Sequence, residues 1–416
     1  RRNHIGYQDM KRHRPGRQFL HTPGPTHIPD RVQNAMHVKA VDFASPEFMD
    51  VAVECFEGLK PLFGLTEGEV FIYTASGHGA WEAAFVNLFE PGDTVLMPET
   101  GRFSRVWGEM GEARGREIAR VPNHRRRAHD TAAVEDAVGA HTDNKIKAVL
   151  MVHTETATGV TSDVPAMRRA IDAAGHPALL VVDAIASWLT VELAMDDWGV
   201  DVVVAASQKG LMLPPGLSFT AVGPKALEAT KNCKTFREYW SWSARLGFEQ
   251  YRRFCGTAPE HMIFGLREAI EIVGEEGLEN VFARHARLAD ATRLCVSEWA
   301  KGGALDFNAV VPEQRANGLT VIRVREDLDA EDIRRTARDM FDVACGGGLA
   351  LLANKVFRIG HMGDINDPMM LGALGGVETT LGYLGLPYES GLGLAAKHLA
   401  DTAPRLNRPA DARTYS

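Results

Sequence analysis

The chain has 416 residues, of which 45% are hydrophobic and 24% are charged, and its formal net charge is −8. This length and composition are typical of a folded protein with about two or three structural units. The negative charge argues against a nucleic acid as the main partner, because phosphate binding needs a basic surface. Two short basic runs, Lys11 to Arg17 and His124 to Arg127, are expected to be solvated loops.

The cysteines and the longest apolar runs limit the kind of protein further. Cys55, Cys233, Cys255, Cys295 and Cys345 are scattered and lack C-x-x-C spacing, which predicts neither a disulfide framework nor a metal site. No stretch reaches the ~18 consecutive apolar residues of a membrane span, and residues 1–20 lack the apolar core of a signal peptide. We therefore expect a cytoplasmic protein, and the first residue, Arg1, leaves an upstream targeting segment open.

Short apolar runs alternate with helical patterns through the first half of the chain. Strands are expected at 70–74, 94–97, 148–153, 178–183 and 202–207, and helices begin near Ala80, Phe103 and Val164. This alternation predicts an α/β fold with a mostly parallel central sheet. The runs 179–182 and 202–204 are continuously apolar, as expected for strands that are covered on both faces.

After a long helix from Glu260 to about Glu279, the pattern changes. It predicts a strand at 320–324, a helix at 331–343, a glycine run at 346–348, a strand at 356–360 and a last helix from Asp367. This order indicates a second, smaller α+β domain. We therefore divide the chain into an N-terminal extension (1–27), a large domain (28–275), a small C-terminal domain (276–400) and a tail (401–416).

The first expected strand ends in a possible anion site. In open parallel sheets, ligands bind beyond the carboxyl ends of the strands. Ser76-Gly77-His78 stands between this strand and the next helix, where glycine permits a close backbone approach and the free helix amides favour an anion. A plain strand-to-helix turn would have the same pattern. A dinucleotide fingerprint is excluded, because Glu82 occupies the position of its last glycine.

Three later strand ends also carry polar groups. The hydroxyl-rich segment from His153 to Gly159 could bond a ring substituent or form a satisfied turn. Asp183 follows four apolar residues, and a buried carboxylate needs either a cation, such as a pyridinium nitrogen, or backbone amides. Lys209 follows the next strand, where burial would favour the neutral, nucleophilic form of its amine. Considered without the other strand ends, this lysine would more simply be a solvated side chain. A lysine, an acid and an anion site together are what pyridoxal phosphate needs.

With these residues, the chain resembles the class V (fold type I) pyridoxal-phosphate aminotransferases, in the alanine/serine–glyoxylate branch. The resemblance covers nearly all of residues 21–390. Its marks are Thr22-Pro23-Gly24-Pro25, Ser76-Gly77-His78, Glu90-Pro91-Gly92-Asp93, His153 to Gly159, Val182-Asp183, Ser207-Gln208-Lys209, Pro214-Pro215-Gly216 and Phe357-Arg358-Ile359-Gly360.

The resemblance implies roles for individual residues. Lys209 would form the Schiff base with the cofactor and move the substrate proton, and Asp183 would pair with the pyridinium nitrogen. Arg358 would hold the substrate α-carboxylate with two hydrogen bonds. Phe103 stands where many relatives stack a tryptophan on the cofactor ring. The other cofactor-binding residues implied are Ser76, Gly77, His78, Thr156, Ile185, Gln208 and, from a neighbouring subunit, Thr257.

One position departs from the family pattern. Relatives bring a tyrosine from the neighbouring subunit to the cofactor phosphate, but Phe254 stands there in this chain. Either Tyr251, Arg252 or Arg253 replaces it, or the contact is absent. The family builds its substrate entrance from this segment and from residues 239–242, so we hypothesise that the aromatic and arginine side chains there alter substrate choice.

The activity that the resemblance implies is transamination in a homodimer with shared active sites. An amino acid such as serine, alanine or aspartate would give its amino group to a 2-oxo acid such as glyoxylate or pyruvate, in a ping-pong mechanism. Two alternatives stay open. A class V lyase or desulfurase could use Cys345 as its nucleophile, although such relatives carry histidine where Gln208 stands. A module that binds the cofactor without turnover is the other.

Overall fold

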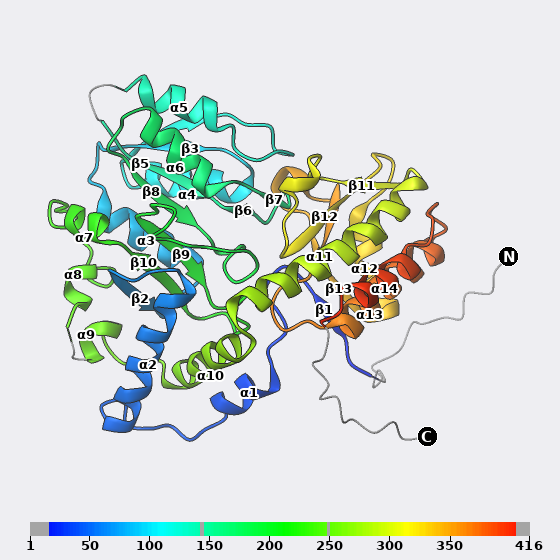
Figure 1. Cartoon of the computed structure of the whole chain (residues 1–416), viewed down its shortest axis with the longest axis horizontal. Coiled ribbons are helices and arrows are strands. Elements are labelled where there is room, and N and C mark those ends of the chain that lie inside the picture. Colours follow the sequence, from blue (N-terminus) through cyan, green and yellow to red (C-terminus); the bar gives the residue numbers. More distant parts are fainter. Residues whose placement is uncertain (1–15, 142–144, 248–249, 405–416) are drawn as a thin grey trace, which may run out of the picture.

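The computed structural model describes residues 16–141, 145–247 and 250–404, with the backbone alone at 250 and 251 (Figure 1). Most of the predicted N-terminal extension, the end of the predicted tail and the first part of the basic run at Lys11 lie outside these ranges. The described chain builds two large sheets, each with its own helices and its own buried hydrophobic residues, and a small two-stranded sheet within residues 154–161.

The larger sheet has seven strands in the order β2-β10-β9-β8-β5-β3-β4. Only β10 pairs antiparallel with its neighbours, and the remaining pairs are parallel, which confirms the predicted mostly parallel sheet. The strands are β2 (Glu69–Tyr73), β10 (Ser218–Val222), β9 (Val202–Ala206), β8 (Leu179–Asp183), β5 (Ile146–Val152), β3 (Thr94–Pro98) and β4 (Glu117–Val121).

Helices cover both faces of this sheet, as the continuous apolar strands predict. Side chains of a strand alternate between faces, so Val203 and Ala205 of β9 enter one core while Val202 and Val204 enter the other. The helices around the sheet are α2 (Pro46–Leu62), α3 (Gly77–Leu88), α4 (Arg102–Ala113), α5 (Thr131–Gly139), α6 (Val164–Ala173), α7 (Pro224–Thr230) and α10 (Glu260–Glu276). Shorter elements are α1 (Asp30–Met36), α8 (Trp242–Arg245), α9 (Gln250–Phe254), β6 (Thr154–Glu155) and β7 (Val160–Thr161).

The second sheet has the order β1-β13-β14-β12-β11 and lies beside the first (Figure 1). Its first strand, β1 (Phe19–His21), comes from the predicted N-terminal extension and pairs with β13 (Val343–Gly347). The others are β14 (Val356–Gly360), β12 (Leu319–Val324) and β11 (Leu305–Phe307). Its helices are α11 (Leu278–Lys301), α12 (Ala330–Phe341), α13 (Asp367–Leu384) and α14 (Leu392–Asp401), with 3-10 turns η1 (Pro312–Gln314) and η2 (Ala350–Leu352). The four-part domain division stays a prediction.

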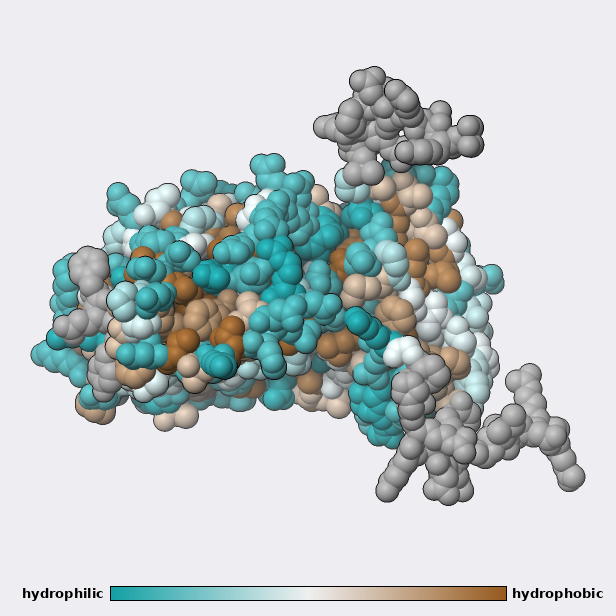
Figure 2. Space-filling model, turned by 90° about the horizontal axis from the view of Figure 1, so that it is seen from below, coloured by the Kyte–Doolittle hydropathy of each residue, from teal (hydrophilic) through white to brown (hydrophobic). Residues whose placement is uncertain are grey.

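Hydrogen bonds join the two halves. Arg126, from the basic run expected to be solvated, donates to the carbonyls of Phe307 at 2.9 Å and Asn308 at 2.7 Å. Seen from below, hydrophobic side chains gather on both sides of a hydrophilic band across the middle of the molecule (Figure 2). Within the described ranges, none of the helices has both the length and the apolar character needed to cross a membrane.

Candidate active site

The carboxyl ends of the large sheet's strands converge on one cavity. Residues from four separate strand ends line it, as expected for parallel strands. The lining includes most of the predicted site residues, namely Ser76, Gly77, His78, Phe103, Thr156, Asp183, Ile185, Gln208 and Lys209. It also includes Trp81, Thr154 and Ala186, which the sequence did not single out.

Lys209 follows β9, and the Thr22 to Thr26 segment holds it in place. Its Nζ donates to the Pro23 carbonyl at 2.5 Å, and the Thr26 hydroxyl donates to the Lys209 carbonyl at 3.1 Å. Burial, and to a smaller extent the charge of Arg358, lower the pKa of Lys209 to about 8, and the charge of Asp183 opposes them. About a tenth of the amine is therefore neutral at pH 7, far more than for an ordinary lysine.

Asp183 ends β8 and accepts two hydrogen bonds. The Trp81 indole donates to Oδ2 at 3.1 Å, and the Ile185 backbone N–H donates to Oδ1 at 2.7 Å. Both donors are neutral, and burial raises the pKa of Asp183 to about 7. A cation brought beside this carboxylate would stabilise its ionised form, so the site fits a pyridinium nitrogen. The backbone-amide contact that the sequence offered as an alternative is present.

The turn between β2 and α3 has the features of a phosphate site. Ser76 is the N-cap of α3, yet its side chain makes no capping hydrogen bond. A Cβ at Gly77 would lie 2.4 Å from Ile185 Cδ1, so a larger residue here would displace the Ile185 side chain at the cavity wall. Among the described residues, the buried Oε1 of Gln208 has no hydrogen-bond partner. Buried polar atoms are normally satisfied, so a side-chain amide with this unpartnered oxygen at the cavity wall fits a bound ligand, and its N–H groups are the donors from which a phosphate oxygen would accept.

Arg358 reaches the same region from the second sheet. It lies on β14 with 8% of its surface exposed, and it donates to the carbonyls of Gly347 at 2.8 Å and Thr156 at 3.3 Å. Burial lowers the pKa of Arg358 to about 10, and the nearby Glu155 opposes this shift. Arg358 is not part of the cavity lining, but its partner Thr156 is. A guanidinium here can hold a carboxylate at the edge of the cavity.

Glu155 is a buried carboxylate whose role the sequence did not reveal. Its Oε2 accepts from the backbone N–H groups of Phe103 at 2.9 Å and Ser104 at 3.2 Å, and its Oε1 accepts from Ala157 at 3.2 Å. Burial raises its pKa to about 7. Glu155 therefore holds the first turn of α4, including Phe103, against the 154–158 segment. The sequence indicated Glu155 only through its place in the hydroxyl-rich segment from His153 to Gly159.

The predicted site residue Thr257 and its neighbours are not in the lining of this cavity. Thr257 is exposed, and Phe254 is buried with its ring centroid 5.6 Å from that of Phe56. Arg253 donates to the Gly247 carbonyl and lies 4.5 Å from the Phe56 ring centroid. The side chain of Tyr251, another predicted substitute for the family tyrosine, falls outside the described part of the chain.

The aromatic segment at 239–242 packs against the body of the large half. Trp242 is buried and donates to the Tyr73 hydroxyl at 2.7 Å, and the Trp240 ring lies 5.3 Å from that of Tyr73. These contacts are structural within one subunit. The predicted effect of this segment on substrate choice stays a hypothesis.

Cys345 has none of the properties of a loop nucleophile. It lies within β13 with 3% of its surface exposed, and burial raises the pKa of its thiol to about 12. A thiol of this pKa is almost entirely protonated at neutral pH, whereas the thiolate is the reactive form. The geometry therefore argues against the desulfurase alternative.

Comparison with known proteins bears directly on this site. The family described as aminotransferase class V matches residues 19–350. Serine–glyoxylate aminotransferase of Methylorubrum extorquens is 42% identical over 92% of this chain and 96% of its own. L-aspartate–glyoxylate aminotransferase of Paracoccus denitrificans is 39% identical over 90% of this chain and 93% of its own. The crystal structure of ureidoglycine–glyoxylate aminotransferase from Bacillus subtilis superposes with a TM-score of 0.84 at 26% identity, covering 94% of this chain and all of that one.

Proposed function

The chain belongs to the class V aminotransferase family, and from this premise we propose that it transfers the amino group of serine, alanine or aspartate to glyoxylate, using Lys209, Asp183 and Arg358. It is a pyridoxal-phosphate-dependent transaminase of fold type I, as the resemblance implied. The proposal rests on one observation above all, which is that the lysine, the acid and the anion turn meet at one edge of the large sheet, with Arg358 of the second sheet hydrogen-bonded to Thr156 in the same cavity wall.

The bound cofactor supplies an electron sink that acidifies the Cα–H bond of the amino acid joined to it. The neutral amine of Lys209 would take the proton from the substrate Cα and deliver it to carbon C4′ of the cofactor. Asp183, in its ionised form, keeps the ring nitrogen protonated. Ser76, Gly77, His78 and Gln208 bind the phosphate, and the rings of Phe103 and Trp81 bound the space in which the cofactor ring lies.

Arg358 orients the substrate. Its guanidinium is held by two carbonyls and is buried, so its remaining N–H groups can bind the α-carboxylate with little loss of side-chain freedom. This contact fixes the direction of the Cα–H bond relative to Lys209. The same contact serves every α-amino acid and 2-oxo acid, which suits the two half-reactions of a ping-pong transaminase.

Glyoxylate is the proposed acceptor because the names of all three relatives above contain it, whereas their amino donors differ. The test is to incubate the purified holoenzyme with glyoxylate and serine, alanine or aspartate, and to measure glycine together with the absorbance of the cofactor. We expect glycine from at least one donor, and none from a Lys209→Met variant. Glycine formation from no donor would refute the proposal.

We also propose a homodimer in which Thr257 reaches the partner's cofactor phosphate. Two observations support it. Thr257 is exposed and remote from its own cavity, and the apolar side chains of Val38, Val41 and Val53 are 43%, 39% and 50% exposed along the segment from α1 to α2. Sedimentation velocity should give a dimer, and Thr257→Ala should weaken cofactor binding; a fully active monomer would contradict the proposal.

The cytoplasmic location is likewise proposed, on the cysteine pattern alone.

A further inference from the structure

Trp81 lies in the wall of the cofactor cavity, between the turn that precedes α3 and the carboxylate of Asp183. It stands on α3 four residues after Gly77 and three after His78, and residues at these spacings share one face of a helix. The centroid of the Trp81 ring lies 4.6 Å from that of His78, and its indole N–H donates to Asp183 Oδ2 at 3.1 Å. One side chain therefore contacts both a residue of the phosphate turn and the acid.

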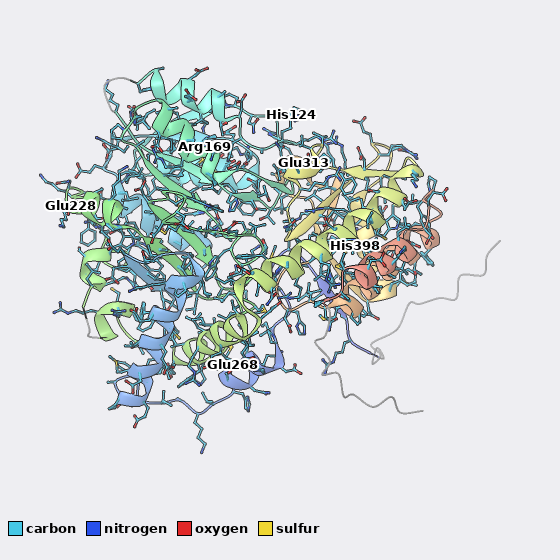
Figure 3. The ribbon with its side chains drawn as sticks, in the orientation of Figure 1. His124, Arg169, Glu228, Glu268, Glu313 and His398 are labelled. Carbon is cyan, nitrogen blue, oxygen red and sulfur yellow. The ribbon has the colours of Figure 1, made fainter. Side chains whose placement is uncertain are left out.

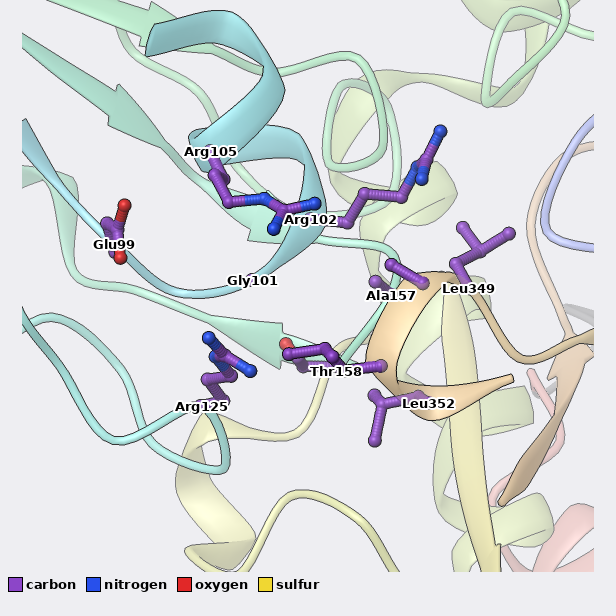
Figure 4. Close-up of a pocket in the computed structure, with 11 residues that line it drawn as sticks. Glu99, Gly101, Arg102, Arg105, Arg125, Ala157, Thr158, Leu349 and Leu352 are labelled. Carbon is purple, nitrogen blue, oxygen red and sulfur yellow. The ribbon is translucent and has the colours of Figure 1, made fainter. Parts of the chain in front are cut away.

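Aromatic neighbours hold the Trp81 ring in place. It is 1% exposed, it stacks on Trp107 of α4 with ring centroids 5.6 Å apart, and it meets Phe103 edge-on at 6.2 Å. Phe103 follows Arg102, which is labelled at the start of α4 in Figure 4. Side chains fill the space between the helices and the large sheet (Figure 3). The indole is therefore packed too tightly to turn away from Asp183.

The indole N–H is a donor without acceptor capacity, and this decides which form of Asp183 it favours. Donor-only partners bind an ionised carboxylate more strongly than a protonated acid. The backbone N–H of Ile185 acts in the same way at 2.7 Å, but any residue at that position except proline would supply it. Trp81 adds a side-chain donor, which opposes the burial that raises the pKa of Asp183. Of the charged groups near this carboxylate, Lys209 also favours its ionised form and Glu155 opposes it.

We propose that Trp81 is a positioning residue for Asp183, which holds this carboxylate ionised and in place to pair with the ring nitrogen of the cofactor. An ionised carboxylate has about four acceptor sites, so its two donors leave both oxygens able to accept from a ring N–H. Without the indole N–H, the buried carboxyl would take up a proton more readily and would pair less strongly with the ring nitrogen. This role rests on the proposed function, in which Asp183 is the acid at the ring nitrogen.

The test compares two ligands that differ only at the ring nitrogen. Pyridoxal phosphate and its deaza analogue, in which C–H replaces this nitrogen, compete for the cofactor-free protein, and the bound ratio is read from the absorbance. The unmodified protein should prefer pyridoxal phosphate. Trp81→Phe should reduce this preference about tenfold, because a hydrogen bond to a charged group is lost. A purely structural role would weaken the binding of both ligands equally, so an unchanged preference would overturn the proposal.

Trp107→Phe is the matched control. Trp107 is fully buried and stacked on Trp81, but among the residues that the structure describes its indole N–H has no hydrogen-bond partner. This variant loses the same ring atoms and removes no hydrogen bond from Asp183, so it should keep the preference for pyridoxal phosphate. If Trp81→Phe does not fold, benzothienylalanine at position 81 keeps both rings and replaces only the N–H by sulfur, and it should show the same loss.

Asp183→Asn separates the role of Trp81 from that of Asp183 itself. A neutral amide cannot form an ion pair with the ring nitrogen, so this variant should lose the preference. If Asp183→Asn loses it while Trp81→Phe keeps it, Trp81 does not have the proposed role and the proposed function stands. If both variants keep it, the role of Asp183 is wrong as well. The competition uses neither an amino donor nor glyoxylate, so its outcome is independent of the transamination assay.

Discussion

Gly24 offers a sharp test of how Lys209 is positioned. Gly24 has a φ of +98°, and a Cβ at this position would lie 2.5 Å from Lys209 Nζ, 2.6 Å from Cδ and 2.7 Å from Cε. Ordinary contact begins near 3.4 Å, so in a Gly24→Ala variant the amine must move by about 1 Å. The lysine side chain is flexible, so the fold should survive this movement while the position of the reactive nitrogen does not.

The expected loss follows from this displacement. A misplacement of about 1 Å at a reacting group costs on the order of 100-fold in rate. The backbone strain of a non-glycine residue at positive φ adds a loss of stability of about 1–2 kcal/mol. Gly92→Ala is the matched control, because Gly92 has a φ of +90° and its Cβ would meet nothing within 4 Å.

The assay compares the two variants in the same way. The free energy of unfolding is measured by urea denaturation, and kcat/KM is measured with the best amino donor and glyoxylate. Both variants should lose similar stability, but only Gly24→Ala should lose about 100-fold in kcat/KM. If Gly24→Ala and Gly92→Ala had the same kcat/KM, the reasoning that Gly24 sets the position of Lys209 would be wrong.

Three further predictions concern buried groups. Glu155→Gln places an amide opposite three backbone N–H donors, so it should lower the unfolding free energy by about 1–3 kcal/mol and weaken cofactor binding in an absorbance titration. Glu109→Gln, an exposed change on α4, the helix whose first turn Glu155 holds, should do neither. Cys345→Ser should retain turnover, and loss of catalysis in a folded variant would revive the desulfurase alternative. Lys209→Met should stabilise the cofactor-free protein at pH 7 by up to about 3 kcal/mol, because the folded state lowers the lysine pKa from 10.5 to about 8 and so disfavours the charged form. This difference should shrink as the pH rises from 8 to 10.5, where the wild-type lysine loses its charge in the unfolded state too; a difference independent of pH would contradict the burial argument.

The sequence by itself determined which residues follow the strands of the large sheet. Apolar runs bounded by glycine and polar residues gave β8 and β9 correctly, so Asp183 and Lys209 were placed at strand ends without any structure. Parallel strands bring their carboxyl ends to one edge, and this rule was enough to predict that the two residues and the Ser76 turn lie together. The family resemblance added Arg358 and the cofactor.

Only the tertiary structure decided the contacts made between distant segments. The Pro23 carbonyl meets Lys209 across 186 positions, Glu155 holds the start of α4, and Trp81 supports Asp183. Periodicity reports which side of its own element a residue occupies, but not which other element lies against that side. These partners depend on how the chain crosses between the two sheets, which local sequence patterns do not encode.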